Sequence, residues 1–316
     1  MAKVLAIGGA GFIGSHVVRA LLGQGHEVTV VDNFSRYGYL PYDFHSSRSL
    51  TIVKEDVRAL PARSFGGYDF VLCLAARAGG VRYLSMNAHS IMKDNTEILM
   101  HSLSSAHSSS PGSVFYFFSS SMVYDGNGTT PSTSYGRQKL SGELMVKSSC
   151  AQRGLSYVIV RPFNAVGAGE MVESGTDGKV EYGMSHVIPD FVYKTMIRQT
   201  PFEILGDGTQ TRTFTHVNDI ADAVALMIEK GTKNDDFDIC GREHLTIIEL
   251  AHRIWKSIHA DAVFPEQKYL PAPDTDVRSI YGSYEKARER LGWEPKHTID
   301  DMIADTVGFI KRHVPF

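Results

Sequence analysis

Lys3-Val-Leu-Ala-Ile-Gly-Gly-Ala-Gly-Phe-Ile-Gly14 decides the fold of this 316-residue chain, because an apolar run leads directly into closely spaced glycines. Residues 3–7 predict a buried strand, and the mixed apolar and polar residues 15–22 predict a helix. Gly8 allows a tight turn, Gly11 lets the backbone approach a ligand, and Gly14 lets the helix pack closely on the strand. The N–H groups of the first helical turn then face an anion. The stretch predicts a pyrophosphate site, although a glycine triplet alone is also compatible with a plain tight turn.

A second apolar strand, residues 27–31, ends at Asp32 and Asn33. Asp32 lies 18 residues beyond Gly14, where a carboxylate accepts hydrogen bonds from the ribose of a dinucleotide and repels a 2′-phosphate. We therefore expect NAD rather than NADP as the cofactor. Arg36 is the one nearby residue that could pair with a 2′-phosphate instead.

Composition excludes several classes of function. The net charge of −3 gives no general attraction to nucleic acid or to an anionic membrane, and 43% hydrophobic residues can bury a sizeable core. The three cysteines are far apart, no Cys/His cluster has zinc spacing, and no apolar run reaches the roughly 18 residues of a membrane span. The chain enters a strand at once, which leaves no room for a signal peptide. We expect a cytoplasmic enzyme without a metal.

The strand–helix alternation continues through the first half of the chain. Further strands are predicted at residues 50–53, 68–75, 113–118 and 156–160, and helices at residues 87–106 and 135–153. This alternation predicts an α/β fold of the Rossmann type, with a doubly wound parallel sheet and a cleft at the carboxyl ends of its strands. We expect a dinucleotide-binding domain at 1–166, with core elements partly shared with later segments. Residues 167–316 should form mainly a smaller mixed α/β cap for substrate, with the polar loop 168–183 as a candidate lid.

Catalytic chemistry is predicted where a serine run follows the 113–118 strand. Tyr135 and Lys139 are four residues apart on a predicted helix, so their side chains project from one face. A lysine ammonium stabilises a neighbouring phenolate and lowers the tyrosine pKa, which makes the tyrosine a usable general base. Ser120 can donate a hydrogen bond to the same substrate oxygen. By itself Tyr-x-x-x-Lys is common by chance, and its position after the glycine stretch gives it weight.

With these motifs the chain resembles the extended short-chain dehydrogenase/reductases, and among them the nucleotide-sugar epimerases and dehydratases. Further matching segments are Asp56-Val57, Leu74-Ala-Ala76, Asn95, Arg161-Pro-Phe-Asn164, Gly206-Asp-Gly-Thr-Gln-Thr-Arg212 and Leu291-Gly-Trp-Glu-Pro295. The resemblance implies that NAD is bound by Gly8, Gly11, Phe12, Ile13, Gly14, Asp32, Asn33, Asp56, Val57, Leu74, Ala75, Ala76, Asn95, Tyr135, Lys139 and Pro162. It implies that a nucleotide-diphosphate sugar, linked to UDP or GDP, is bound by Ser120, Ser121, Met122, Asn164, Val187, Arg212 and Arg278.

Departures from the family pattern favour one reaction. Ser121 and Met122 stand where the 4,6-dehydratases place an aspartate and a glutamate. Several segments are also similar to the GDP-mannose 3,5-epimerases, but Met122 and Val187 stand where those enzymes place a cysteine and a lysine. The redox set Ser120, Tyr135 and Lys139 remains, which favours 4-epimerisation through a transient 4-keto sugar. A dehydratase, mutase or keto-reductase of the same family stays open as an alternative. A non-enzymatic dinucleotide sensor is disfavoured because Tyr135 and Lys139 are both present.

Assembly and further pocket residues are also predicted. In the resembling family two helices of each subunit pair with their copies in a four-helix bundle, so we expect a homodimer. The apolar residues expected to point outward for this contact are Ile98, Leu99, Leu103, Leu140, Leu144 and Met145. His186, Arg82 and Tyr83 are additional candidates for the substrate pocket.

Overall fold

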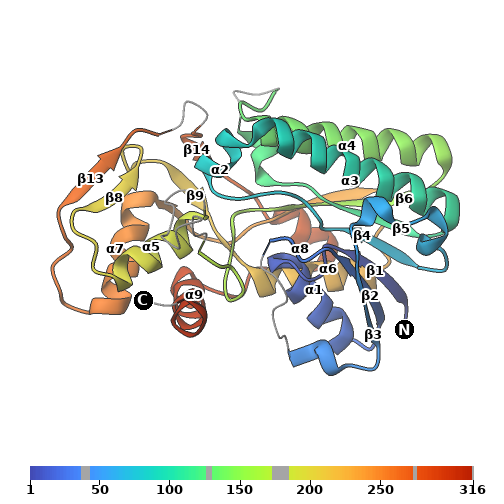
Figure 1. Cartoon of the computed structure of the whole chain (residues 1–316), viewed down its shortest axis with the longest axis horizontal. Coiled ribbons are helices and arrows are strands. Elements are labelled where there is room, and N and C mark those ends of the chain that lie inside the picture. Colours follow the sequence, from blue (N-terminus) through green and yellow to red (C-terminus); the bar gives the residue numbers. More distant parts are fainter. Residues whose placement is uncertain (37–42, 126–129, 173–184, 273–275, 315–316) are drawn as a thin grey trace.

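The computed structural model describes residues 1–36, 43–125, 130–172, 185–272 and 276–314, and in these residues a seven-stranded parallel sheet forms the centre of the larger part (Figure 1). Its order is β11-β6-β5-β4-β1-β2-β3, and every neighbouring pair is parallel. The strands are β1 (Lys3–Ile7), β2 (Glu27–Asp32), β3 (Leu50–Lys54), β4 (Phe70–Cys73), β5 (Val114–Phe118), β6 (Ser156–Pro162) and β11 (Asp235–Ile239). The predicted Rossmann-type fold is confirmed.

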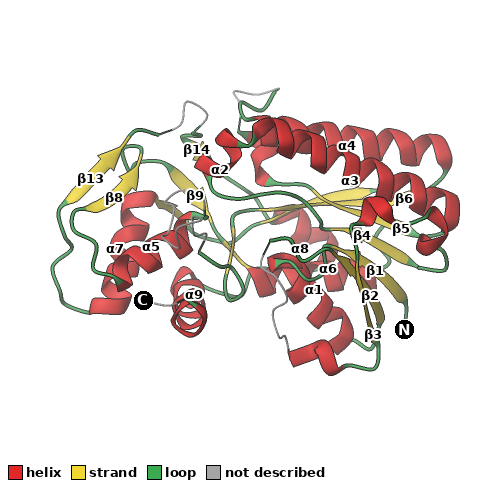
Figure 2. Ribbon diagram, in the orientation of Figure 1, coloured by secondary structure: helices red, strands yellow, loops and turns green. Residues whose placement is uncertain are grey.

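Helices cover both faces of this sheet, because successive side chains of a strand point to opposite sides. Val4 and Ala6 of β1 belong to a core shared with α1 (Phe12–Gly23), α6 (Val217–Glu229) and α8 (Glu285–Leu291). Leu5 and Ile7 belong to a core on the other face, shared with α3 (Ala88–Ser109) and α4 (Ser134–Arg153). Figure 2 shows α3 and α4 side by side on one face and α1 with α6 on the other.

The smaller part has its own core among three helices, α5 (Val187–Met196), α7 (Ile247–His259) and α9 (Ile299–His313). Short strands surround them: β7 (Ala165–Val166), β8 (Phe202–Leu205), β9 (Thr211–Thr213), β10 (Thr215–His216), β12 (His244–Thr246), β13 (Gln267–Leu270) and β14 (Ser279–Ile280). The chain crosses between the two parts repeatedly, since β11, α6 and α8 follow residue 166 yet pack in the larger part. Most of the predicted lid 168–183, from residue 173 onward, lies outside the described residues.

Strand β4 is shorter than the predicted 68–75. The N–H groups of Leu74 and Ala75 both donate to the carbonyl of Ile7, at 2.9 Å each, so the chain leaves the ladder after Cys73. This departure carries Leu74, Ala75 and Ala76 over the glycine turn that follows β1. Within the described parts of the chain, no helix combines the length and apolar character needed to cross a membrane.

The prediction that Leu99 and Leu103 of α3 point outward is wrong. Both side chains are buried in the core under the sheet, with exposed fractions of 1% and 3%. The apolar side chains that α3 and α4 do expose are Met92, Met100 and Leu144. A separation of four residues places Leu99 and Leu103 on one face of α3, but it does not tell whether that face meets the sheet or points to solvent. Here the sheet covers it.

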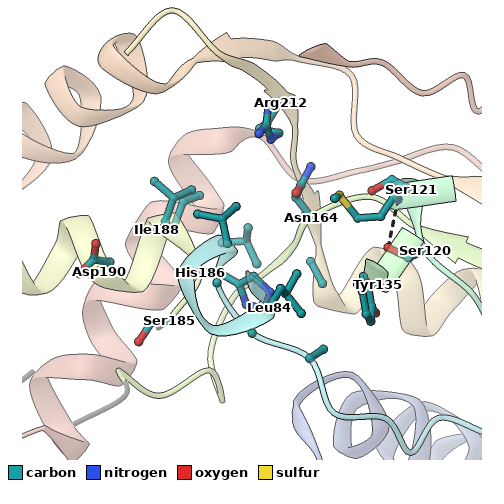
Figure 3. A pocket seen from close by; sticks show the side chains of 18 of the residues that line it. Leu84, Ser120, Ser121, Tyr135, Asn164, Ser185, His186, Ile188, Asp190 and Arg212 are labelled. Atoms are coloured by element: carbon teal, nitrogen blue, oxygen red, sulfur yellow. Dashed lines mark hydrogen bonds between the residues drawn. The ribbon is translucent and has the colours of Figure 1, made fainter. Parts of the chain in front are cut away.

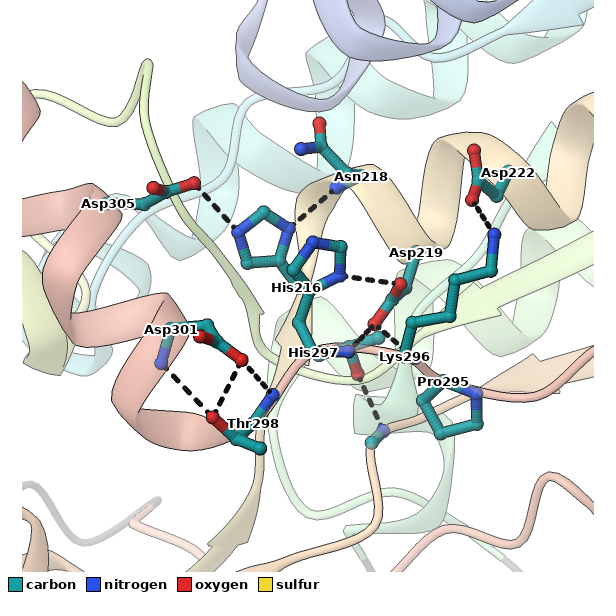
Figure 4. A network of polar contacts seen from close by, with 12 residues as sticks. His216, Asn218, Asp219, Asp222, Pro295, Lys296, His297, Thr298, Asp301 and Asp305 are labelled. Carbon is teal, nitrogen blue, oxygen red and sulfur yellow. Dashed lines mark hydrogen bonds and ion pairs between the residues drawn. The ribbon is translucent and has the colours of Figure 1, made fainter.

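A polar network joins the two parts near the start of α6 (Figure 4). His216 precedes this helix, and its Nδ1 accepts a hydrogen bond from the backbone N–H of Asn218 at 3.1 Å. Its Nε2 lies 3.0 Å from a carboxylate oxygen of Asp305 on α9. The ring of His297 stacks on His216 at 3.9 Å between centroids, and its Nδ1 lies 2.8 Å from the fully buried Asp219. The network therefore ties α9 of the smaller part to α6 of the larger part.

Candidate active site

The glycine turn after β1 has the shape of a phosphate cradle. Gly8 has a φ of +81°, and a Cβ there would lie 2.5 Å from the backbone nitrogen of Ala75. A Cβ on Gly14 would lie 2.2 Å from the carbonyl oxygen of Gly8, so α1 could not pack this closely on the turn. Gly11 precedes α1, and no side chain caps the helix. The N–H groups at its start can thus face a phosphate, which fits the pyrophosphate of NAD.

Asp32 follows as expected at the carboxyl end of β2. One carboxylate oxygen accepts from the backbone N–H of Ala10 at 3.0 Å, and the other accepts from Phe34 at 2.8 Å. Burial raises the pKa of Asp32, and the two backbone N–H groups act in the opposite direction. The side chain is therefore held between the glycine turn and the end of β2, where a ribose would lie.

A second acidic group lies next to this position. Asn33 donates a side-chain hydrogen bond to Asp56, and the pKa of Asp56 is lowered chiefly by its hydrogen bond to the Arg58 side chain. Asp56 also accepts from the backbone N–H of Arg58 and begins the short turn that buries Val57. Asn33, Asp56 and Val57 are thus brought together beside Asp32, as an adenosine site requires.

Asn95, on α3, forms hydrogen bonds to the backbone of the segment that follows β4. Its Oδ1 accepts from the backbone N–H of Arg77 at 2.7 Å, and its Nδ2 donates to the carbonyl of Arg77 at 3.1 Å. The side chain is 4% exposed. Asn95 therefore fixes the segment that carries Ala75 and Ala76, and it acts on the predicted cofactor site through that segment.

A cavity of about 330 Å³ opens beside the glycine turn and brings many of the predicted residues together (Figure 3). From the larger part it is lined by Phe12, Ile13, Ser120, Ser121, Met122, Tyr135, Pro162 and Asn164. From the smaller part it is lined by residues that include Glu170, His186, Val187, Asp190, Lys194, Gln210, Arg212 and Asp276. The residues from both parts meet at the carboxyl ends of β5 and β6, where such sheets bind ligands.

Local structure presents Tyr135 to this cavity. Asp125 accepts from the Thr133 backbone N–H at 3.1 Å and from its hydroxyl, and Thr133 Oγ1 in turn accepts from Gly136 at 3.0 Å. This cap fixes the start of α4, so Tyr135 lies in the first turn and Lys139 one turn further along. Lys139 Nζ is 5.7 Å from the centre of the Tyr135 ring and donates to the carbonyl of Phe118 at 2.7 Å.

The pKa of Tyr135 is not lowered as the sequence led us to expect. Burial raises it to about 12, and the hydrogen bond with Ser120 only partly offsets this effect. Burial also lowers the pKa of Lys139 to about 8. Desolvation therefore outweighs both the hydrogen bond with Ser120 and the charge of Arg36, and the expected effect of Lys139 on the tyrosine pKa is not seen. The Lys139 ammonium donates to the Phe118 carbonyl instead. The positive charge of an oxidised nicotinamide, where NAD is bound, acts to lower the tyrosine pKa.

A buried charge network that the sequence did not reveal supports the serine run. Ser119 Oγ donates to Glu143 at 2.6 Å, and Arg161 makes two hydrogen bonds of 2.7 Å to the two oxygens of the same carboxylate. The Arg161 Nη1 also reaches Asp236 and Asp238 of β11 at 2.8 and 3.2 Å. Glu143 is one turn beyond Lys139 on α4, so the network locks that helix against the ends of β5 and β6.

The substrate side of the cavity contains Asn164 and Arg212 close to the positions expected of them. Asn164 donates to the carbonyl of Thr213 at 2.7 Å, which ties the loop after β6 to β9. Arg212, on β9, forms an ion pair of 3.1 Å with Asp276, and both side chains are nearly buried. Arg278 is placed differently: its side chain is 72% exposed, pairs with Asp207 at 3.0 Å and is not among the residues that line the cavity.

His186 does line the cavity, and it has a partner that sequence alone did not supply. Its Nδ1 forms a short hydrogen bond with Glu170, a carboxylate that is 2% exposed. Tyr83 accepts a hydrogen bond from the Arg77 side chain, and Arg82 is exposed; neither is among the lining residues. In the described part of the chain, no cluster of three His, Cys, Asp or Glu side chains could hold a metal ion.

Comparison with known proteins agrees with this geometry. Residues 4–240 match the model of the NAD dependent epimerase/dehydratase family. The chain belongs to that family. The resemblance inferred from the motifs is thereby confirmed, and so is the prediction of NAD as the cofactor.

Individual relatives span nearly the whole chain. The chain is 27% identical to UDP-glucose 4-epimerase of Lactobacillus helveticus, over 98% of both sequences. The structure of a UDP-glucose 4-epimerase from Thermotoga maritima with UDP-glucose is similar at a TM-score of 0.82 and 27% identity, covering 99% of this chain and 100% of that one. A dTDP-glucose 4,6-dehydratase from Streptomyces venezuelae with NAD bound is similar at 0.85 and 25%, covering 98% and 97%.

Proposed function

We propose that the protein is an NAD-dependent nucleotide-sugar 4-epimerase. The observation that carries the proposal is the composition of the cavity at the end of β5. Tyr135 is hydrogen-bonded to Ser120, while the next two positions, Ser121 and Met122, offer no acid that could protonate a leaving hydroxyl or remove a carbon-bound proton. A site that has Ser120, Tyr135 and Lys139 but no acidic side chain at positions 121 and 122 suits the oxidation and re-reduction of a single sugar hydroxyl.

In this mechanism Tyr135 accepts the proton of the C4 hydroxyl and returns it at the end of the cycle. Ser120 Oγ accepts from the backbone N–H of Met122 at 3.2 Å, so its own hydrogen is available to Tyr135 and to the substrate oxygen. Lys139, with its Nζ 5.7 Å from the centre of the Tyr135 ring, would hold the nicotinamide ribose. The chemistry that bound NAD would supply here is reversible hydride transfer at C4, which leaves the reaction without net redox change.

Inversion requires that the sugar turn while the nucleotide stays in place. Asn164 and Arg212 line the same cavity as Tyr135, and Figure 3 shows Arg212 well away from Tyr135. Both side chains suit the pyrophosphate of the substrate. Binding energy from the nucleotide would then hold the keto-sugar in the cavity between the two hydride transfers. The relative with bound UDP-glucose supports a nucleotide sugar as the substrate.

A dehydratase is the main alternative, because one similar structure is a dTDP-glucose 4,6-dehydratase. Incubation with a panel of UDP- and GDP-sugars, followed by chromatography, separates the two reactions. We expect a C4 epimer of equal mass and no accumulation of NADH in the near-ultraviolet spectrum. A product lighter by one water would identify a dehydratase, and stoichiometric NADH would identify a net oxidoreductase.

A further inference from the structure

The pair formed by His186 and Glu170 is an ionisable group in the substrate cavity that the epimerase mechanism does not use. Glu170 is 2% exposed, and its second oxygen is buried with no hydrogen-bond partner among the described residues. A buried carboxylate is costly unless a donor or a positive charge compensates it. The donor that it has is Nδ1 of His186, 16 residues further along the chain.

This pairing determines which atom of His186 faces a ligand. Because a carboxylate only accepts, Nδ1 is the nitrogen that carries the shared hydrogen. Nε2 is then left for the cavity, and the imidazole side chain remains 45% exposed. His186 immediately precedes α5, but its side chain does not cap that helix. The imidazole is therefore held by Glu170 rather than by its own backbone, in the central region of the cavity wall drawn in Figure 3.

The charges around the cavity indicate what Nε2 recognises. Among the described lining residues the carboxylates are Glu170, Asp190 and Asp276, and the permanent cations are Lys194 and Arg212. Lys194 is paired with Asp190 at 3.1 Å, and Arg212 with Asp276 at 3.1 Å. Among these described residues Glu170 is therefore the carboxylate that has no lysine or arginine partner, and His186 is the basic group against it. An imidazole that bridges Glu170 and an anionic oxygen of a ligand donates a hydrogen bond from each ring nitrogen.

We propose that His186 recognises an anionic oxygen of the substrate through Nε2, and that Glu170 is its positioning residue. The oxygen belongs to a phosphate of the nucleotide or to a carboxylate on the sugar. This inference rests on the proposed function, because it assumes that a nucleotide sugar enters the cavity.

The test is calorimetric binding of UDP, GDP, UDP-glucose and UDP-glucuronate to the NAD-loaded protein. His186→Asn keeps an amide near Nδ1, and so the contact with Glu170, but removes Nε2. We expect this variant to lose about tenfold in affinity, as loss of a charge-assisted hydrogen bond would give. A loss shared by all four ligands assigns the contact to a phosphate, and a loss confined to UDP-glucuronate assigns it to a sugar carboxylate. His89→Asn, an exposed histidine outside the cavity, is the matched control.

Glu170→Gln separates recognition from a merely structural role. The amide keeps the shape of the side chain but removes the charge that holds Nδ1, so this variant should weaken binding of the same ligands as His186→Asn. Neither variant should unfold at a lower urea concentration than the wild type. Equal affinities of wild type and His186→Asn for all four ligands would overturn the inference. If the wild type binds none of the four nucleotides, the proposed function itself is wrong and the inference falls with it.

Discussion

Tyr135 is the residue on which turnover should depend most directly. Tyr135 is half-buried at the cavity, with its hydroxyl bonded to Ser120, so removal of the hydroxyl leaves the packing of the ring intact. We expect Tyr135→Phe to retain bound NAD and to lose activity by about 100-fold or more, the range typical for loss of a general base. Chromatographic initial rates and the NAD content of the purified protein measure the two effects.

Tyr116→Phe is the matched control for this substitution. The Tyr116 hydroxyl is buried in the sheet core without a hydrogen-bond partner among the described residues, and it lies outside the cavity. Its removal should leave activity unchanged. Activity of Tyr135→Phe within a few-fold of the wild type would show that another group accepts the proton.

Met122 and Val187 decide whether carbon-bound protons exchange with solvent. Both line the cavity, and neither side chain can carry a proton. In deuterium oxide, with the true nucleotide sugar, we therefore expect a product without deuterium at C3 or C5, and with its C4 hydrogen retained. Mass spectrometry and proton NMR of the product provide the measurement. Deuterium at C5 would show that a carbon acid is deprotonated, and Glu170 with His186 would then be the first groups to test.

At the scale of elements, local motifs were predictable and contacts across the fold were not. The close approach of Gly14 to Gly8 and the position of Tyr135 one turn before Lys139 involve neighbours a few residues apart, so their spacing indicates this local geometry. The contacts of Gly8 with Ala75 and of Lys139 with Phe118 come from distant segments and could not be predicted in this way. Glu143 on α4 pairs with Arg161 on β6, and nothing in the spacing of the two residues predicts this ion pair. The same holds for Glu170 and His186, which the fold brings together from a loop and the start of α5.

Helices α3 and α4 carry the surface on which the dimer prediction depends. Leu99 and Leu103 are buried, whereas Leu144 is exposed as predicted, so the contact would use Leu144 together with the exposed Met92 and Met100. We expect light scattering at micromolar concentration to give twice the mass of the chain, and Leu144→Glu to shift it toward the monomer by burying a charge in the interface. Ile197→Glu places the same charge on an apolar residue of similar exposure away from these helices. A monomeric wild type would contradict the prediction.

At the scale of the whole molecule, two buried histidines connect the parts that form the cavity. His16 of α1 bonds to Asn218 Oδ1 at 2.7 Å and to the carbonyl of Ala168 at 2.8 Å, while His216 reaches Asp305. Burial lowers the pKa of both histidines below the ordinary value of 6.5. The two rings therefore favour their neutral forms in the folded protein. Protonation of either ring should destabilise the contact between the larger and the smaller part.

Stability should consequently fall as the solution becomes acidic. As pH drops through 6.5 the unfolded chain takes up protons on these histidines before the folded chain does, so the free energy of unfolding decreases. The loss continues down to the lowered pKa of each folded-state ring, with a limiting slope of about 1.4 kcal/mol per pH unit for each group. His216→Asn keeps an acceptor for the N–H of Asn218 but cannot titrate, so urea unfolding at several pH values should show a shallower decline. His89→Asn, which removes an exposed ring, should follow the wild type. Parallel declines for His216→Asn and the wild type would mean that the acid sensitivity of the fold arises elsewhere than at the start of α6.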